Sequence, residues 1–133
     1  MIARWPGKIK PHTITDHLSA FWDVLPTLTE LTGIVLPPDI DGLSFLPTLL
    51  GNNDRQKTHD YLYWEYNGAQ ALRIGALKAY RPRINQPIEL YHLKDDPAEQ
   101  QNLAQINLEI LAQITDIMQS ARTESKHFPL NRQ

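Results

Sequence analysis

The stretch from Tyr61 to Leu103 constrains the fold most, because strand-forming segments alternate with turns and then give way to a helical pattern. It contains YLYWEY, QALRIGALKAYR and IELYHL, whose aromatic and branched residues suit a half-buried sheet surface. The turn Lys94-Asp95-Asp96-Pro97 follows. Asp96 precedes a proline and is disfavoured in helical geometry, whereas Pro97 can begin a new turn or helix. We therefore expect a small antiparallel sheet that leads into a C-terminal helix.

The sequence after Pro97 has a helical period. Apolar residues recur at three- and four-residue steps, which predicts an amphipathic helix of roughly four turns. Its apolar members are Leu108, Leu111, Ile114, Ile117 and Met118. In the last predicted strand, Leu90 lies on one face and Tyr91 on the other. The acidic pair before Pro97 could hint at a cation site, but a turn and helix start explain it better.

The first 55 residues read as short elements separated by prolines and glycines. Met1 to Trp5 and His17 to Phe21 are expected to be short strands. A helix is predicted from Asp23 to Thr32, with Asp23 as its N-cap and Gly33 ending it in the left-handed conformation. A second short helix is predicted from Ser44 to Leu50. The apolar face of the first helix would consist of Val24, Leu25, Leu28 and Leu31.

Composition excludes several classes of function. The net charge is −2 with histidine neutral, so nothing indicates a nucleic-acid or membrane-surface partner. The chain has no cysteine, which excludes disulfides, thiolate metal sites and a cysteine nucleophile. Its 133 residues are enough for a real core, and its 10 prolines are spread over the whole length, which indicates many short elements with fixed connections.

No common catalytic motif is present. The sequence lacks a phosphate-binding loop, a dinucleotide glycine fingerprint, HExxH and a nucleophile elbow. The five histidines lack metal-ligand spacing and are best explained as exposed loop residues. Trp64 and its neighbouring tyrosines either pack in the core or offer a ring to stack on a sugar. Arg73 is either a surface residue or an anion contact. The residues alone therefore indicate an α+β domain without a self-contained active site.

The order of segments resembles the C-terminal part of a formylglycine-dependent sulfatase, of the arylsulfatase family within the alkaline-phosphatase-like superfamily. The matching pieces are MIARWPGKIKP, DHLSAFWDVLPTLTELTG, DIDGLSFLPTLLG, YLYWEY, ALRIGALKAYR and ELYHLKDDPAEQQNLA. Each piece is weak alone, but together they cover most of the chain in the family's order. The resemblance implies that residues 1–55 are the incomplete end of a large α/β domain, a strand-helix remnant, and that residues 56–133 are the smaller C-terminal subdomain. We therefore expect a truncated fragment.

Family chemistry is the hydrolysis of sulfuric esters. The resemblance implies a formylglycine, made from Cys or Ser within C/S-x-P/A-x-R, and a divalent metal, usually calcium, that meets the charge on the sulfate. This sequence has no cysteine, and none of its serines has the required spacing to proline and arginine. No catalytic or metal residue can therefore be assigned here, and we expect the chain alone to be inactive. Whether it counts as an enzyme is left open.

The C-terminal subdomain of the family borders the substrate cleft. By that analogy, Trp64, Asn67, Arg73 and His127 are the candidates for the substrate rim. The implied partners are the missing N-terminal sulfatase domain and a sulfated small molecule or glycan. Apolar faces that would pack on that domain should be exposed here, which favours a homodimer. An exported or periplasmic location is expected of the family. The alternative is a stand-alone, noncatalytic glycan-binding or interaction module derived from a sulfatase.

Overall fold

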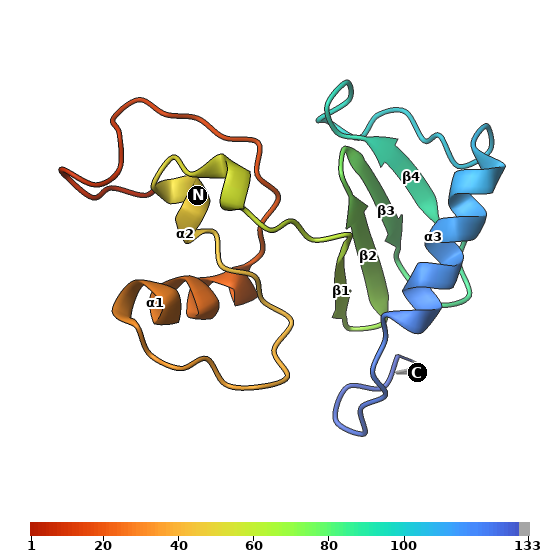
Figure 1. Cartoon of the computed structure of the whole chain (residues 1–133). Coiled ribbons are helices and arrows are strands. Elements are labelled where there is room, and N and C mark those ends of the chain that lie inside the picture. The colour runs from red at the N-terminus through yellow and green to blue at the C-terminus, as the bar shows by residue number, and fades with distance from the viewer. Residues whose placement is uncertain (131–133) are drawn as a thin grey trace. The chain divides into compact units, whose positions relative to one another are not determined.

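The computed structural model describes residues 1–130, and the chain divides into two compact units, Met1–His59 and Asp60–Gln133 (Figure 1). The division therefore follows His59, whereas the sequence placed a boundary after residue 55. Within residues 1–130, no helix is long and apolar enough to cross a bilayer. Each unit is described by itself.

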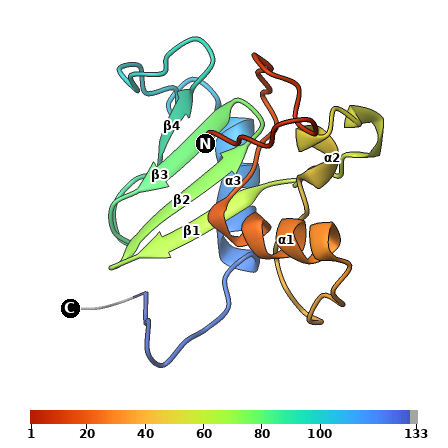
Figure 2. The ribbon, with the colours of Figure 1, turned by 90° about the vertical axis from the view of Figure 1, so that its left-hand side faces the viewer.

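The second unit is built on a four-stranded antiparallel sheet with the order β1-β2-β3-β4. The strands are β1 (Leu62–Tyr66), β2 (Ala69–Ile74), β3 (Leu77–Arg81) and β4 (Glu89–His92). Each strand pairs with the next one in sequence, so short turns suffice to connect the first three (Figure 2). The predicted α+β class and the sheet of about four strands are confirmed.

Two tight turns set the register of this sheet. Asn67 and Gly68 connect β1 to β2 with φ angles of 48° and 83°, and they bring Tyr66 opposite Ala69. Positive φ at both central residues is the geometry that matches the twist of a two-residue hairpin, and Asn-Gly is the pair that adopts it most readily. Gly75, with φ 52°, lies in the corresponding tight turn between β2 and β3. The segment QALRIGALKAYR is thus a hairpin of two strands.

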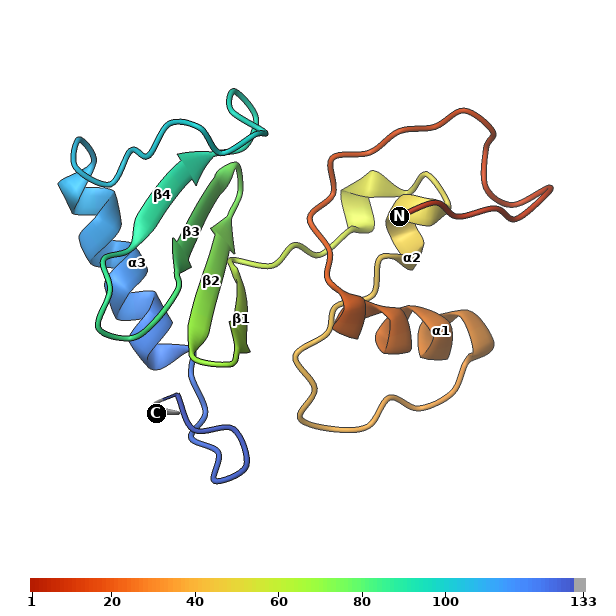
Figure 3. The same cartoon turned by 180° about the vertical axis from the view of Figure 1, so that it is seen from behind.

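Helix α3 (Leu108–Ser120) packs on one face of the sheet (Figure 3). Side chains alternate along each strand, so every second residue of β2, β3 and β4 faces this helix. The buried members of the core are Leu72, Ala79, Leu90, Ala104, Ile114 and Met118. Full burial of a large aliphatic side chain contributes about 1.5–3 kcal/mol. The predicted amphipathic C-terminal helix is confirmed, and its apolar spacing is what buries it.

The segment between β4 and α3 is a turn followed by irregular backbone. The Asp96 carboxylate accepts hydrogen bonds from the backbone N–H of Gln100 (3.0 Å) and of Gln101 (2.8 Å), and these bonds lower the pKa of Asp96. The N–H of Leu103 then donates to the carbonyl of Leu90 at 2.7 Å, which holds the segment against β4. The predicted turn is present, but the helix begins only at Leu108 rather than after Pro97.

The first unit has short helices joined by long connections. It contains a 3₁₀ turn η1 (Phe21–Asp23), α1 (Val24–Thr32), α2 (Leu46–Leu49) and a 3₁₀ turn η2 (Asn53–Arg55). Gly33 ends α1 with φ 70°, as predicted. The strands expected at residues 1–5 and 17–21 are wrong, because residues 1–59 contain no strand with which either could pair. A strand without a hydrogen-bonded neighbour is not stable in water.

Helix α1 buries Thr27 and Thr29 and exposes its leucines. Leu25, Leu28 and Leu31 are between 41% and 52% exposed. The buried face instead carries Thr27, whose hydroxyl donates to the Asp23 carbonyl at 2.6 Å and accepts from the Phe45 N–H at 3.0 Å. Since those bonds satisfy the hydroxyl, a threonine can be buried without a large penalty.

Candidate functional site

A buried carboxylate organises the first unit. Asp23 is 1% exposed, and it accepts hydrogen bonds from the backbone N–H of Ala20 at 2.6 Å and of Leu43 at 2.8 Å. Its Oδ1 also lies 2.8 Å from His59 Nε2. Asp23 is the N-cap residue of α1, as predicted, but the predicted capping bond is absent: its side chain bonds no N–H in the first turn of α1 and joins three segments instead. Sequence spacing could not reveal this, because the partners are up to 36 positions away.

The histidines at 17 and 59 both lie near this carboxylate. Burial lowers the pKa of His17, while the charge of Asp23 opposes that effect and His59 reinforces it. His59 lies in a loop as expected, but the expectation that it is exposed is wrong, because its side chain is only 10% exposed. In residues 1–130, no three His, Asp or Glu side chains form a group able to hold a metal ion. The hydrogen bonds of Asp23 tie together loops that are far apart in sequence.

The predicted rim residues lie at different places in the second unit. Trp64 and Arg73 are on the sheet face opposite α3, because they alternate with residues that face the helix. Arg73 Nε donates to the Gly75 carbonyl at 2.8 Å, which holds it near the β2–β3 turn. Asn67 lies at the other end of the hairpin, about 16 Å away, because it is five residues beyond Leu62, the residue that pairs with Arg73. The structure therefore does not bring Arg73 and Asn67 together.

Asn67 lies near the C-terminal tail. It lines a surface pocket of about 360 Å³ together with Tyr66 and with Phe128, which follows the exposed His127. Tyr66 is 85% exposed and Phe128 is 74% exposed. The sequence placed Tyr66 in the aromatic cluster but did not single it out. Tyr66 is the last residue of β1, next to the turn at Asn67, whereas Leu62 on the same face of the strand is buried.

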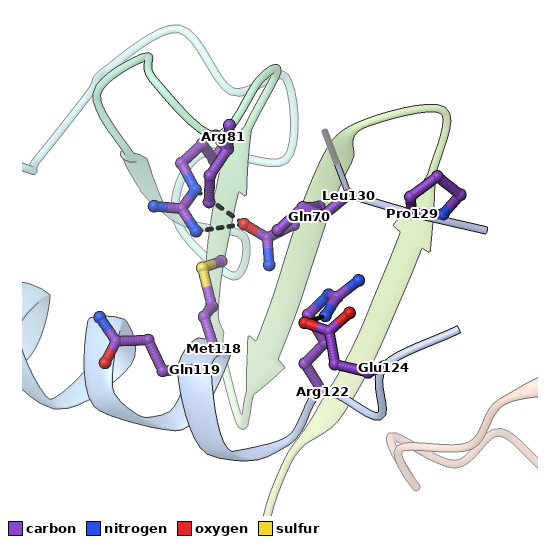
Figure 4. Close-up of a pocket in the computed structure, with 9 residues that line it drawn as sticks. Gln70, Arg81, Met118, Gln119, Arg122, Glu124, Pro129 and Leu130 are labelled. Carbon is purple, nitrogen blue, oxygen red and sulfur yellow. Dashed lines mark hydrogen bonds and ion pairs between the residues drawn. The ribbon is translucent and has the colours of Figure 1, made fainter. Parts of the chain in front are cut away.

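A polar network occupies the α3 side of β1, β2 and β3. Gln70 is 2% exposed, and its amide nitrogen donates to the Tyr63 hydroxyl at 2.5 Å. Tyr63 in turn donates to Glu65. Burial and the bond to Glu65 raise the pKa of Tyr63 to about 12. On its other side, Gln70 Oε1 accepts from Arg81 Nε at 2.8 Å and from Arg81 Nη2 (Figure 4).

The end of α3 completes this network. Arg122 Nε lies 2.8 Å from Glu65 Oε1, and Arg122 Nη1 pairs with Glu124. Four members of the network, Gln70, Arg81, Arg122 and Glu124, border a pocket of about 390 Å³. Its lining residues are Gln70, Arg81, Ile84, Met118, Gln119, Arg122, Glu124, Pro129 and Leu130. None of the four predicted rim residues is among them. Sequence reasoning missed this pocket because its residues come from two strands, a loop, a helix and the tail.

Comparison with known proteins identifies the family. A family model described as N-sulphoglucosamine sulphohydrolase, C-terminal, matches residues 1–125. The chain belongs to this sulfatase family. The ulvan-active sulfatase of Formosa agariphila is 32% identical over 77% of this chain and 28% of its own length. A solved 2-O GAG sulfatase is 33% identical with a TM-score of 0.63 over 74% of this chain and 23% of its own.

The similarity extends over both units. A solved structure from work on glycosaminoglycan metabolism by Bacteroides thetaiotaomicron has a TM-score of 0.70 at 26% identity, over 91% of this chain and 28% of its own. The chain spans between 22% and 28% of the length of four curated sulfatases that it matches, the ulvan-active sulfatase among them. It therefore corresponds to the C-terminal quarter of those sulfatases.

The residues of this chain do not fit the family's catalytic group. A formylglycine requires a cysteine or serine in the C/S-x-P/A-x-R motif, and the sequence has neither a cysteine nor a serine in that context. The carboxylates and histidines of residues 1–130 do not converge as metal ligands either. No step of sulfate-ester hydrolysis is therefore assigned to residues of this chain.

Proposed function

We propose that this chain is the C-terminal part of a sulfatase, a sulfuric ester hydrolase, and that it shapes the substrate cleft but does not turn over substrate alone. The single observation that supports the proposal most is coverage: a C-terminal family model matches nearly the whole chain, which spans only about a quarter of its sulfatase relatives. The formylglycine and the divalent metal, usually calcium, would then be supplied by the N-terminal domain.

The exposed face of α1 supports the same partner. Its three half-exposed leucines and Phe21, which is 89% exposed, form an apolar surface that an N-terminal sulfatase domain would cover. In such an assembly, Trp64, Asn67, Arg73 and His127 would border the cleft that receives a sulfated small molecule or glycan. Arg73 would contact an anionic group of the substrate through its planar guanidinium.

A chimera tests this proposal. The chain would replace the matching C-terminal region of the ulvan-active sulfatase, and sulfate release would be compared for the chimera and for the isolated 133-residue chain. We expect release from the chimera and none from the chain alone. Turnover by the pure chain, with calcium supplied, would overturn the proposal.

The rim assignment has its own test in the same chimera. Arg73→Ala should raise KM while kcat and formylglycine content stay unchanged, and Arg83→Ala, which removes an exposed arginine of the β3–β4 connection, serves as the charge-matched control. Equal kinetics for the two variants would reject Arg73 as a rim residue without touching the sulfatase assignment.

A second candidate function is a stand-alone glycan-binding module. The exposed rings of Tyr66 and Phe128 beside a surface pocket favour it, because aromatic faces stack on sugars. Calorimetry of the chain with neutral oligosaccharides should then show binding that Tyr66→Ala abolishes. Absence of any heat of binding at millimolar oligosaccharide would remove this candidate.

A further inference from the structure

We propose that the pocket between the α3 side of the sheet and the C-terminal tail binds the carboxylate or sulfate group of a sugar-sized anion, and that Arg81 is its cationic contact. The inference concerns the second unit alone. It does not depend on sulfuric ester hydrolysis, and the pocket is separate from the predicted rim residues.

The guanidinium of Arg81 has no carboxylate partner among the described residues. Both hydrogen bonds of its guanidinium go to one neutral acceptor, Gln70 Oε1. Among residues 1–130 it forms no ion pair, whereas Lys78 pairs with Glu99 at 2.6 Å and Arg122 pairs with two carboxylates. Arg81 is half-buried, and a cation that has lost part of its water without gaining a counter-ion favours an anionic ligand.

Gln70 fixes the direction in which Arg81 points. The amide is buried, and its nitrogen is already engaged by the Tyr63 hydroxyl, so its oxygen must face Arg81. Figure 4 shows that one terminal nitrogen of Arg81 points away from Gln70. The guanidinium is therefore oriented before any ligand arrives, which reduces the entropy lost on binding.

The pocket is suited to a sugar ring as well as to its charge. Its volume of about 390 Å³ falls within the ~300–1,000 Å³ typical of small-molecule sites. Apolar groups of Ile84, Met118, Pro129 and Leu130 line it and can cover the C–H face of a ring. Figure 4 labels the last three of these residues. Gln119 also lines the pocket, and its amide is of a kind that bonds a hydroxyl. Glu124 also lines the pocket, and its 88% exposed carboxylate repels an incoming anion.

The test is a binding titration of the full 133-residue chain. Calorimetry measures the affinity, and the NMR signal of the Arg81 Nε–H reports whether Arg81 contacts the ligand. The probes are glucuronate, which carries a carboxylate, glucose 6-sulfate, which carries a sulfate ester, and glucose, which is neutral. We expect at least one anion to bind and to shift the Arg81 signal, and glucose not to bind. The stronger of the two anions identifies the group that the pocket prefers.

Three variants test the cause. Arg81→Gln should weaken anion binding about tenfold or more, since a hydrogen bond to a charged group is lost. Arg83→Gln removes the same charge two residues away, outside the pocket, and should change affinity less than twofold. Glu124→Gln should tighten binding several-fold, because it removes a repulsive carboxylate and the ion-pair partner of Arg122, which also lines the pocket, while Arg81 and Gln70 stay as they are.

The last variant keeps the test valid if Arg81→Gln unfolds. Equal binding of glucose and the anions would overturn the proposal, as would equal losses for the Arg81 and Arg83 variants or an unchanged affinity in Glu124→Gln. A failed chimera in the sulfatase assay would leave this result unaffected, because the chain itself is titrated here.

Discussion

Replacement of Asp23 by alanine should destabilise the first unit strongly. The carboxylate is 1% exposed and accepts from the N–H groups of Ala20 and Leu43 at 2.6 and 2.8 Å, and it lies 2.8 Å from His59. Hydrogen bonds to a charged group contribute ~1.5–3 kcal/mol each, and removal of one partner of a buried pair costs ~3–5 kcal/mol. Because such terms are not additive, we expect a loss of about 3–5 kcal/mol in the free energy of unfolding.

That loss is a large part of the ~5–15 kcal/mol that holds a domain folded. Amide hydrogen exchange reports it locally, which matters because the two units need not unfold together. Exchange at Leu43 should accelerate roughly a hundredfold to several-thousandfold, since each ~1.4 kcal/mol is a factor of ten. Exchange at Leu90, in the core of the other unit, should change little.

Matched variants separate the tie from a general loss of charge. His59→Ala removes one of the three contacts and should cost about 1–2 kcal/mol. Asp16→Ala removes an exposed aspartate seven residues upstream and should change stability by no more than ~0.5 kcal/mol. If Asp23→Ala and Asp16→Ala lose equal stability, the proposed role of the buried carboxylate is refuted.

Three further outcomes are expected. Gly42→Ala would place a Cβ in steric conflict with the Trp22 carbonyl oxygen, so urea denaturation should show a loss of about 1–3 kcal/mol, and an unchanged midpoint would contradict this contact. Tyr63→Phe should remove from the tyrosinate absorbance titration the phenol whose pKa is about 12. Because the folded pKa is raised, its stabilisation is complete below ~pH 10 and is lost as pH rises towards 12, and a missing phenol with a midpoint near 10 would count against it. Light scattering should show a homodimer through the half-exposed leucines of α1 that Leu28→Gln shifts to monomer, whereas a monomeric wild-type chain at high concentration would disprove the association.

Much of the second unit could be predicted from sequence because its signals are local. Apolar residues at three- and four-residue steps predicted α3, and segments rich in aromatic and branched residues predicted the strands. The helix start was misplaced, because Pro97 only permits a helix, while Asp96 and the contact between Leu103 and Leu90 hold the next residues in an irregular path. A turn signal cannot tell whether a tertiary contact will delay the element that follows.

The first unit was predicted less well, because its structure depends more on contacts between residues that are distant in sequence. The two expected strands have suitable residues but no partner in residues 1–59 on which to form a ladder. Asp23 is a residue type that favours N-cap positions, yet its carboxylate bonds Leu43 and His59, which are distant in sequence, and not the first turn of α1. Local chemistry indicated that Asp23 would accept hydrogen bonds, and only the fold determined which ones.

For the candidate sites too, sequence determined the residue types, and the tertiary structure determined which residues lie together. Sequence alone determined the sulfatase resemblance, the absence of a formylglycine motif and the residue types suited to a substrate rim. It could not show that Arg73 and Asn67 lie at opposite ends of a hairpin. Nor could it show that Arg81, Gln70 and Arg122 gather around one pocket. Periodicity is a property of neighbours in sequence, whereas the charge balance of a pocket depends on which distant side chains packing brings together, and only the tertiary structure decides that.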